Sequence, residues 1–164
     1  MKDKDIFTER YYNGDDFPIL HGKSCPDEIK RPIIKSFGRA CRAVNTRYKL
    51  AIIDFIYEFL KSDIARTYQY DYTLYSQGDR CIAGKILDTL NKDNIKPIDD
   101  ATALADEEVA YWLGFLIISW IYEDDCEPVD LLKYDWERIY WGYDVLHTTS
   151  IKYTIEIIKE DMTK

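Results

Sequence analysis

The sequence lacks basic residues across a long stretch of its second half. Between Pro97 and Leu132 it contains no lysine and no arginine, although the same stretch holds ten carboxylates. They are Asp99, Asp100, Asp106, Glu107, Glu108, Glu123, Asp124, Asp125, Glu127 and Asp130. A field of one sign steers and orients charged partners but implies no particular reaction. The stretch therefore indicates the kind of partner that the protein binds and does not indicate a reaction that it catalyses.

Metal-binding and redox motifs are also missing. The four cysteines lie 16, 40 and 45 positions apart, so no Cys-x-x-Cys pair is present to hold zinc or to exchange disulfides. They are Cys25, Cys41, Cys81 and Cys126. Only two histidines could add ligands, and the acidic run at 123–125 lacks the alternating ligands and central glycine of an EF-hand loop. We therefore expect no metal and no cofactor.

No segment has the length of a membrane span or the character of a signal peptide. The longest uncharged apolar run, Val109 to Tyr122, has fourteen residues, whereas crossing a bilayer takes about 20. The N-terminus opens on charged residues and no apolar core follows. We expect a cytoplasmic protein with reduced thiols that does not contact a membrane.

A catalytic arrangement of residues is not evident either. Asp144 could orient the imidazole of His147, and Cys126 could supply a thiol, but acyl-transfer chemistry also needs an oxyanion site. Such sites usually come from glycine-rich backbone, and here Gly114 and Gly142 stand alone inside predicted helices. A histidine at a helix C-terminus more often bonds the terminal carbonyls. We therefore predict that the protein is not an enzyme.

What the sequence does contain is enough apolar and aromatic material for one folded core. Its 164 residues are 46% hydrophobic and include 14 Tyr, 6 Phe and 4 Trp, a composition too apolar for a disordered chain. A chain of this length suits one domain. We expect a single helical domain over residues 1–164, with an irregular N-terminal arm over about residues 1–24.

Apolar residues recur at three- and four-residue spacing along most of the chain, which predicts helices. The predicted fold is all-α, a compact bundle of about six helices around a central apolar helix at about 106–122. Asp106 would cap that central helix, and a second helix would run from Thr46 to Ile64. The segment Tyr68 to Leu74 is predicted to be helical or irregular. Further helices are expected at about 24–45, 79–91, 128–134, 136–146 and 151–160.

The first helix should carry a basic face beside its apolar one. From Lys23 to Lys49 the chain has eight bases against two acids, and four of them recur at helical spacing. These are Arg31, Lys35, Arg39 and Arg42. Such a face could grip nucleic-acid phosphates. A solvated surface is the competing interpretation, and the net charge of −8 opposes binding to a polyanion.

The four tryptophans could form an aromatic cage or a base-stacking platform. Their spacing on apolar helices instead favours burial in the core. They are Trp112, Trp120, Trp136 and Trp141.

The end of the predicted central helix is the best candidate for a binding surface. Five carboxylates cluster there, beside Trp120 and Tyr122, and we call them the acidic corner. They are Glu123, Asp124, Asp125, Glu127 and Asp130. Carboxylates for steering and aromatics for anchoring would suit a basic protein partner.

The C-terminal third contains three segments in a characteristic order, namely Trp112-Leu113-Gly114-Phe115, Tyr143-Asp144-Val145-Leu146-His147-Thr148 and the amphipathic stretch Ile151 to Ile158. This arrangement resembles a family of small, functionally uncharacterised domains common in gut Firmicutes. It covers about residues 107–160. In that family a hydrophobic helix leads to a Tyr-Asp-x-Leu-His-Thr corner, matched here by Tyr143, Asp144, Leu146, His147 and Thr148. The genes often lie beside genes for toxins resembling ADP-ribosyltransferases, which implies an antitoxin or immunity-like role.

Together these features predict a non-catalytic protein that neutralises a partner, a toxin resembling ADP-ribosyltransferases, through the acidic corner. A nucleic-acid-associated regulator that uses the basic face is the alternative, and an enzyme of unknown class is third. The sequence leaves the identity of the partner and the oligomeric state open.

Overall fold

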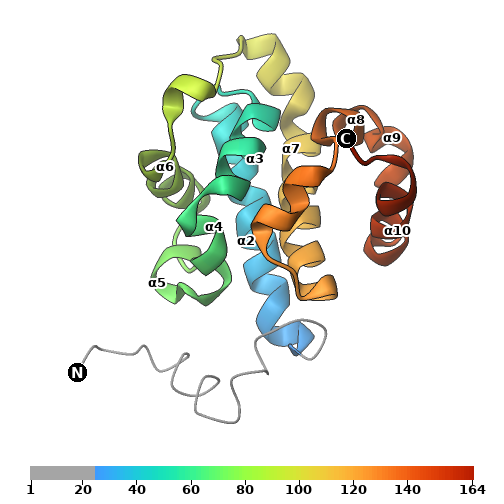
Figure 1. Cartoon of the computed structure of the whole chain (residues 1–164). Coiled ribbons are helices and arrows are strands. Elements are labelled where there is room, and N and C mark those ends of the chain that lie inside the picture. The colour runs from blue at the N-terminus through green and yellow to red at the C-terminus, as the bar shows by residue number, and fades with distance from the viewer. Residues whose placement is uncertain (1–24) are drawn as a thin grey trace, which may run out of the picture.

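The computed structural model describes residues 25–164, which fold almost entirely into helices (Figure 1). Two long helices, α2 (Asp27–Thr46) and α7 (Asp100–Asp124), pack side by side in antiparallel directions at the centre. Before α7 come α3 (Ile52–Lys61), α4 (Asp63–Thr67), η3 (Tyr68–Tyr70), α5 (Tyr72–Tyr75), α6 (Asp79–Thr89) and η4 (Lys92–Asn94). After it come η5 (Pro128–Lys133), α8 (Trp136–Trp141), α9 (Tyr143–Leu146) and α10 (Ile151–Asp161). Helix α6 packs on α2, and α10 packs on α7.

The prediction of an all-α fold around a central apolar helix is confirmed. Residues 25–164 contain no strand, only two isolated bridges that join Leu50 to Pro97 and Tyr134 to Thr163. The described part of the chain forms nine α-helices and three 3₁₀ helices rather than about six helices, because several of the helices are very short. The predicted N-terminal arm lies outside the described residues.

Helix α7 is central because it is apolar on nearly every side. Leu113, Leu116 and Ile117 have no exposed surface, and Trp120 is 1% exposed. On the facing side, Phe37 of α2 packs against the ring of Phe59 with ring centroids 4.4 Å apart. The two long helices therefore share one core with α3.

Two glycines allow α2 and α7 to approach closely. A Cβ atom at Gly114 would lie 2.7 Å from the Sγ of Cys41 and 2.9 Å from the carbonyl oxygen of Phe37. Across the interface, a Cβ at Gly38 would lie 3.0 Å from the carbonyl oxygen of Tyr111. Gly114 therefore marks a close approach of the two helices.

Two predicted helix starts were wrong. Helix α3 begins at Ile52 rather than Thr46, because Ala51 donates its N–H to the carbonyl of Lys96 and Ile98 donates to that of Lys49. This pairing holds residues 47–51 out of a helix. Helix α7 begins at Asp100, with Asp99 as its cap, while Asp106 is a buried residue inside the helix.

The C-terminal helices are more broken than their periodicity predicts. The helix expected over 136–146 is two helices, α8 and α9, because the chain leaves helical geometry at Gly142, where ψ is 0°. Gly142 therefore joins two helices rather than lying inside one. The helix expected over 128–134 is the 3₁₀ helix η5.

The segment from Tyr68 to Leu74 combines η3 with the start of α5.

Candidate partner-binding surface

The acidic corner lies where α7 ends and the chain turns back through η5. Asp124 is the last residue of α7, and Asp125 follows with a φ of 49°. Aspartate tolerates this left-handed conformation better than most residues. The turn carries Glu127 to the start of η5, which Pro128 begins. The tight turn between α7 and η5 therefore brings together carboxylates from eight consecutive positions of the sequence.

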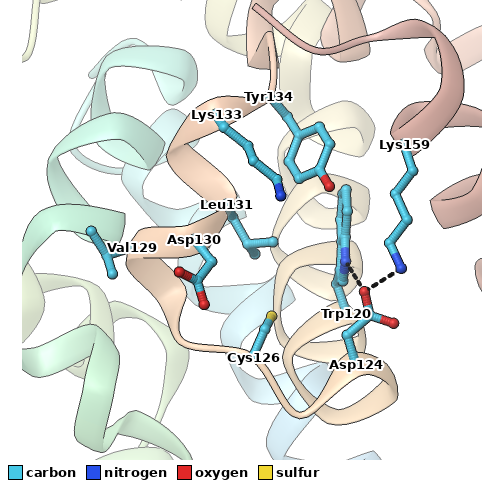
Figure 2. A pocket seen from close by; sticks show the side chains of 9 residues that line it. All are labelled: Trp120, Asp124, Cys126, Val129, Asp130, Leu131, Lys133, Tyr134 and Lys159. Carbon is cyan, nitrogen blue, oxygen red and sulfur yellow. Dashed lines mark hydrogen bonds and ion pairs between the residues drawn. The ribbon is translucent and has the colours of Figure 1, made fainter.

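Asp124 is held by two donors from its own chain. The Nε1–H of Trp120 donates to its Oδ2 across 2.8 Å, and the Nζ of Lys159 lies 2.5 Å from the same oxygen (Figure 2). The hydrogen bond to Asp124 raises the pKa of Lys159. Asp124 therefore ties α10 to α7, and it is not an uncompensated charge.

The remaining members of the acidic corner differ in exposure. Asp130 accepts a hydrogen bond from the backbone N–H of Glu127 across 3.0 Å, which closes the first turn of η5. Glu123 is half-buried. Asp125, Glu127 and Asp130 are exposed. The negative charge that a partner meets is therefore centred on the turn at 125–130.

This turn separates two cavities. One has a volume of about 650 Å³ and is walled by Trp120, Tyr134, Lys133 and the exposed Val129, with Asp130 at its edge (Figure 2). Cys126 belongs to the walls of both cavities.

The second cavity has a volume of about 330 Å³, and one of its lining residues has a side-chain oxygen that lacks a donor. Arg66, Gln69, Asp125 and Glu127 are among the residues that line it. Gln69 is 9% exposed, and its Nε2 donates to the hydroxyl of Tyr70. Its Oε1 is buried without a hydrogen bond. A buried acceptor in this state carries a desolvation penalty that an incoming donor would relieve.

The charge segregation seen in the sequence is only partly kept in three dimensions. Lys49 reaches Asp100 at 3.3 Å, and Lys159 reaches Asp124, although both lysines lie outside the base-free stretch. Asp106 is 8% exposed and accepts a hydrogen bond from the hydroxyl of Tyr140. Several of the ten carboxylates therefore have structural partners.

Among residues 25–164, no hydrogen bond joins the candidate nucleophile Cys126 to the candidate base His147. Burial, followed by the charges of Asp124 and Asp130, raises the pKa of Cys126 to about 12, so its sulfur is a neutral thiol. The Nδ1 of His147 lies 2.6 Å from the carbonyl oxygen of Tyr143, and the two rings stack 4.2 Å apart.

The predicted structural corner closes the end of α9. Leu146 is buried, and Thr148 donates its hydroxyl to the carbonyl of Val145 across 2.7 Å. Tyr143 packs edge-on against Trp112, with ring centroids 5.5 Å apart. Asp144 is exposed. The corner thus joins the short helices to α7, and Ser150 then caps α10 by accepting the N–H of Tyr153.

The predicted basic face lies along α2 and is partly occupied by a contact within the fold. The guanidinium of Arg42 lies 5.3 Å from the centre of the Tyr111 ring. Arg31 and Arg39 are exposed, and Lys35 is half-buried.

The tryptophans divide between core and surface. Trp120 and Trp136 are buried, and Trp112 is half-buried. Trp141 is 74% exposed, so its predicted place in the core was wrong. Five positions from Trp136 is about 140° around a helix, and because Trp136 faces the core, this spacing turns Trp141 towards solvent.

No family model, no curated protein sequence and no solved structure matches this chain. Within residues 25–164, no helix has the length and apolar character needed to cross a membrane. The same residues contain no group of three or more metal-ligating side chains placed to share an ion.

Proposed function

We propose that this protein is a non-catalytic binding protein that engages a basic protein partner through the acidic corner. One observation carries the proposal, namely that Gln69, whose buried Oε1 has no donor, lines a cavity together with Asp125 and Glu127. A lysine or arginine side chain of a partner would donate to this oxygen while its charge is balanced by the carboxylates.

The residues around the acidic corner favour a protein partner over a small cation. Val129 is 53% exposed beside the larger cavity, so an apolar side chain next to the basic one would also find a contact. Interfaces commonly combine an anchored side chain with a charged rim. The expected motif is a basic residue flanked by an apolar one.

Neutralisation of a toxin is the setting that we propose for this interaction. The resemblance of residues 107–160 to domains encoded beside toxins similar to ADP-ribosyltransferases supports it. A second basis is chemical, since a basic enzyme surface would be complementary to the acidic corner.

Affinity capture with two versions of the protein tests the proposal. In the first version Asp125→Asn and Glu127→Gln remove two charges while keeping side-chain size. In the control version Asp144→Asn and Glu156→Gln remove the same charges from exposed positions on α9 and α10. We expect wild type and control to retain the same basic protein from an extract of the source cells, and the first version to lose it. Equal retention by all three would contradict the proposal.

A further inference from the structure

A third cavity, of about 240 Å³, lies where α2, α7 and the start of α10 meet. Ile34 of α2, Phe115 of α7 and Ile151 of α10 give it an apolar wall. Glu123 is the one residue that it shares with the acidic corner. Apart from Glu123, this cavity and the proposed partner surface have no residue in common.

Two residues that line this cavity carry buried hydroxyl groups without hydrogen-bond partners. Ser119 is 8% exposed and Tyr122 is 2% exposed, and neither the Oγ of Ser119 nor the hydroxyl of Tyr122 has a hydrogen bond. The Tyr122 hydroxyl lies near Cys25, Tyr70 and Tyr75, none of which lines the cavity, so Ser119 is the one of the two whose hydroxyl we assign to the site. Buried hydroxyls are usually paired, because an unpaired one carries a desolvation penalty. The unpaired hydroxyl of Ser119 is explained if a ligand supplies its acceptor.

The charged groups around the cavity favour an anion as that ligand. Helix α10 begins at Ile151, and the N–H groups of Ile151 and Lys152 have no acceptor within the helix. The positive end of the helix dipole lies at this end of α10 and attracts an anion. The side chains of Arg31 and Lys152 line the same cavity and are exposed.

Two carboxylates also line the cavity, and the balance still favours an anion. Asp27 forms an ion pair with Lys30, whose Nζ lies 3.4 Å from its Oδ1. The charge of Glu123 is then opposed by Arg31, Lys152 and the start of α10. Around this cavity, the neutral and charged groups that can donate a hydrogen bond therefore outnumber the groups that can only accept one.

We propose that this cavity binds a small organic oxyanion, a carboxylate or phosphate group carried on a short apolar body. The oxyanion would accept hydrogen bonds from the start of α10, Arg31 and the hydroxyl of Ser119. The apolar body would contact Phe115 and Ile34.

Titration with benzoate and phenyl phosphate, followed by the backbone amide signals of the full-length protein, tests this site. We expect saturable shifts that are largest at Ile151, Lys152 and Ser119. The probe that binds with the higher affinity shows whether the site prefers a carboxylate or a phosphate. Acetate and inorganic phosphate, which lack the apolar body, should bind more weakly.

Three variants make the test specific. Arg31→Gln and Ser119→Ala should each weaken binding by about tenfold, since each removes a hydrogen bond to a charged group. Arg39→Gln removes an exposed charge from the same helix but does not line the cavity, so binding should be unchanged. Without ligand, Ser119→Ala should melt at the same temperature or higher, because it removes an unpaired buried hydroxyl.

The proposal is overturned if neither probe produces saturable shifts, or if Arg39→Gln weakens binding as much as Arg31→Gln does.

Discussion

At the scale of single residues, burial decides which side chains tolerate a charge. Leu116 lies in the middle of α7 and has no exposed surface, whereas Leu104 lies on the same helix and is 74% exposed. The same substitution at these two sites therefore separates the effect of burial from that of helix propensity.

We predict that Leu116→Asp lowers the free energy of unfolding by about 4 kcal/mol or more, because it buries an unpaired carboxylate. Leu104→Asp should change it by less than about 1 kcal/mol. Chemical denaturation of both variants checks this, and equal stabilities would show that α7 is not the centre of the core.

Single residues also show where sequence patterns stop being informative. The exposure of Trp141 follows from its spacing relative to Trp136, so it could have been predicted. The burial of Asp106 could not, because its hydrogen-bond donor, Tyr140, lies 34 positions away. The unpaired oxygen of Gln69 likewise depends on how η3 packs and leaves no trace in the local sequence.

At the scale of elements, the contact between α2 and α7 depends on the absence of side chains at Gly38 and Gly114. The atoms that a Cβ at Gly114 would meet include a backbone carbonyl, which cannot turn away as a flexible side chain could. The two helices would therefore have to separate.

Gly114→Ala should destabilise the protein by about 1–3 kcal/mol through overpacking, even though alanine favours the helix. Gly78→Ser is the control, because a Cβ at Gly78 meets no atom within 4 Å and serine suits the position before α6. Thermal unfolding should show a loss only in the first variant. A Gly114→Ala protein as stable as wild type would contradict the close approach.

The start of α7 gives a pH-dependent prediction. Hydrogen bonds from Thr102 lower the pKa of Asp99 below its ordinary value near 3.8. A carboxylate with a lowered pKa stabilises the fold fully above its unfolded-state pKa, and the effect is lost as pH falls through the folded-state pKa.

Asp99→Ala should therefore melt below wild type at pH 7, and the difference should shrink at pH values below about 4. Asp99→Asn keeps a capping oxygen but cannot titrate, so its stability should be less sensitive to pH in this range. A difference between Asp99→Ala and wild type that stays constant down to pH 2 would rule out the charged cap.

Periodicity located most of the helices, but their ends depended on contacts that are distant in sequence. The strongest acidic start signal, at Asp106 to Glu108, begins at the seventh residue of α7, because the alanine-rich residues before it extend the helix back to Asp100. The start of α3 was displaced by pairing with residues 95–98. Helix type is therefore a local property here, whereas helix boundaries are not.

At the scale of the whole molecule, the sequence presents a basic first part and an acidic second part, and folding rearranges that contrast. Lys49 and Lys159 cross from other parts of the chain to Asp100 and Asp124. The all-α architecture could be predicted from composition and periodicity. The final distribution of charge could not, because it depends on which distant side chains meet.

The most direct test of the acidic corner is the rate at which a captured partner associates with it. Asp124 is left intact in this test, because its contacts with Trp120 and Lys159 make it structural. We predict that Asp125→Asn with Glu127→Gln slows association by roughly three- to tenfold at low salt, and that the difference largely disappears at high salt. Asp144→Asn with Glu156→Gln, which carries the same net charge, should associate like wild type. Identical rates for all three proteins at low salt would contradict a binding role for the acidic corner.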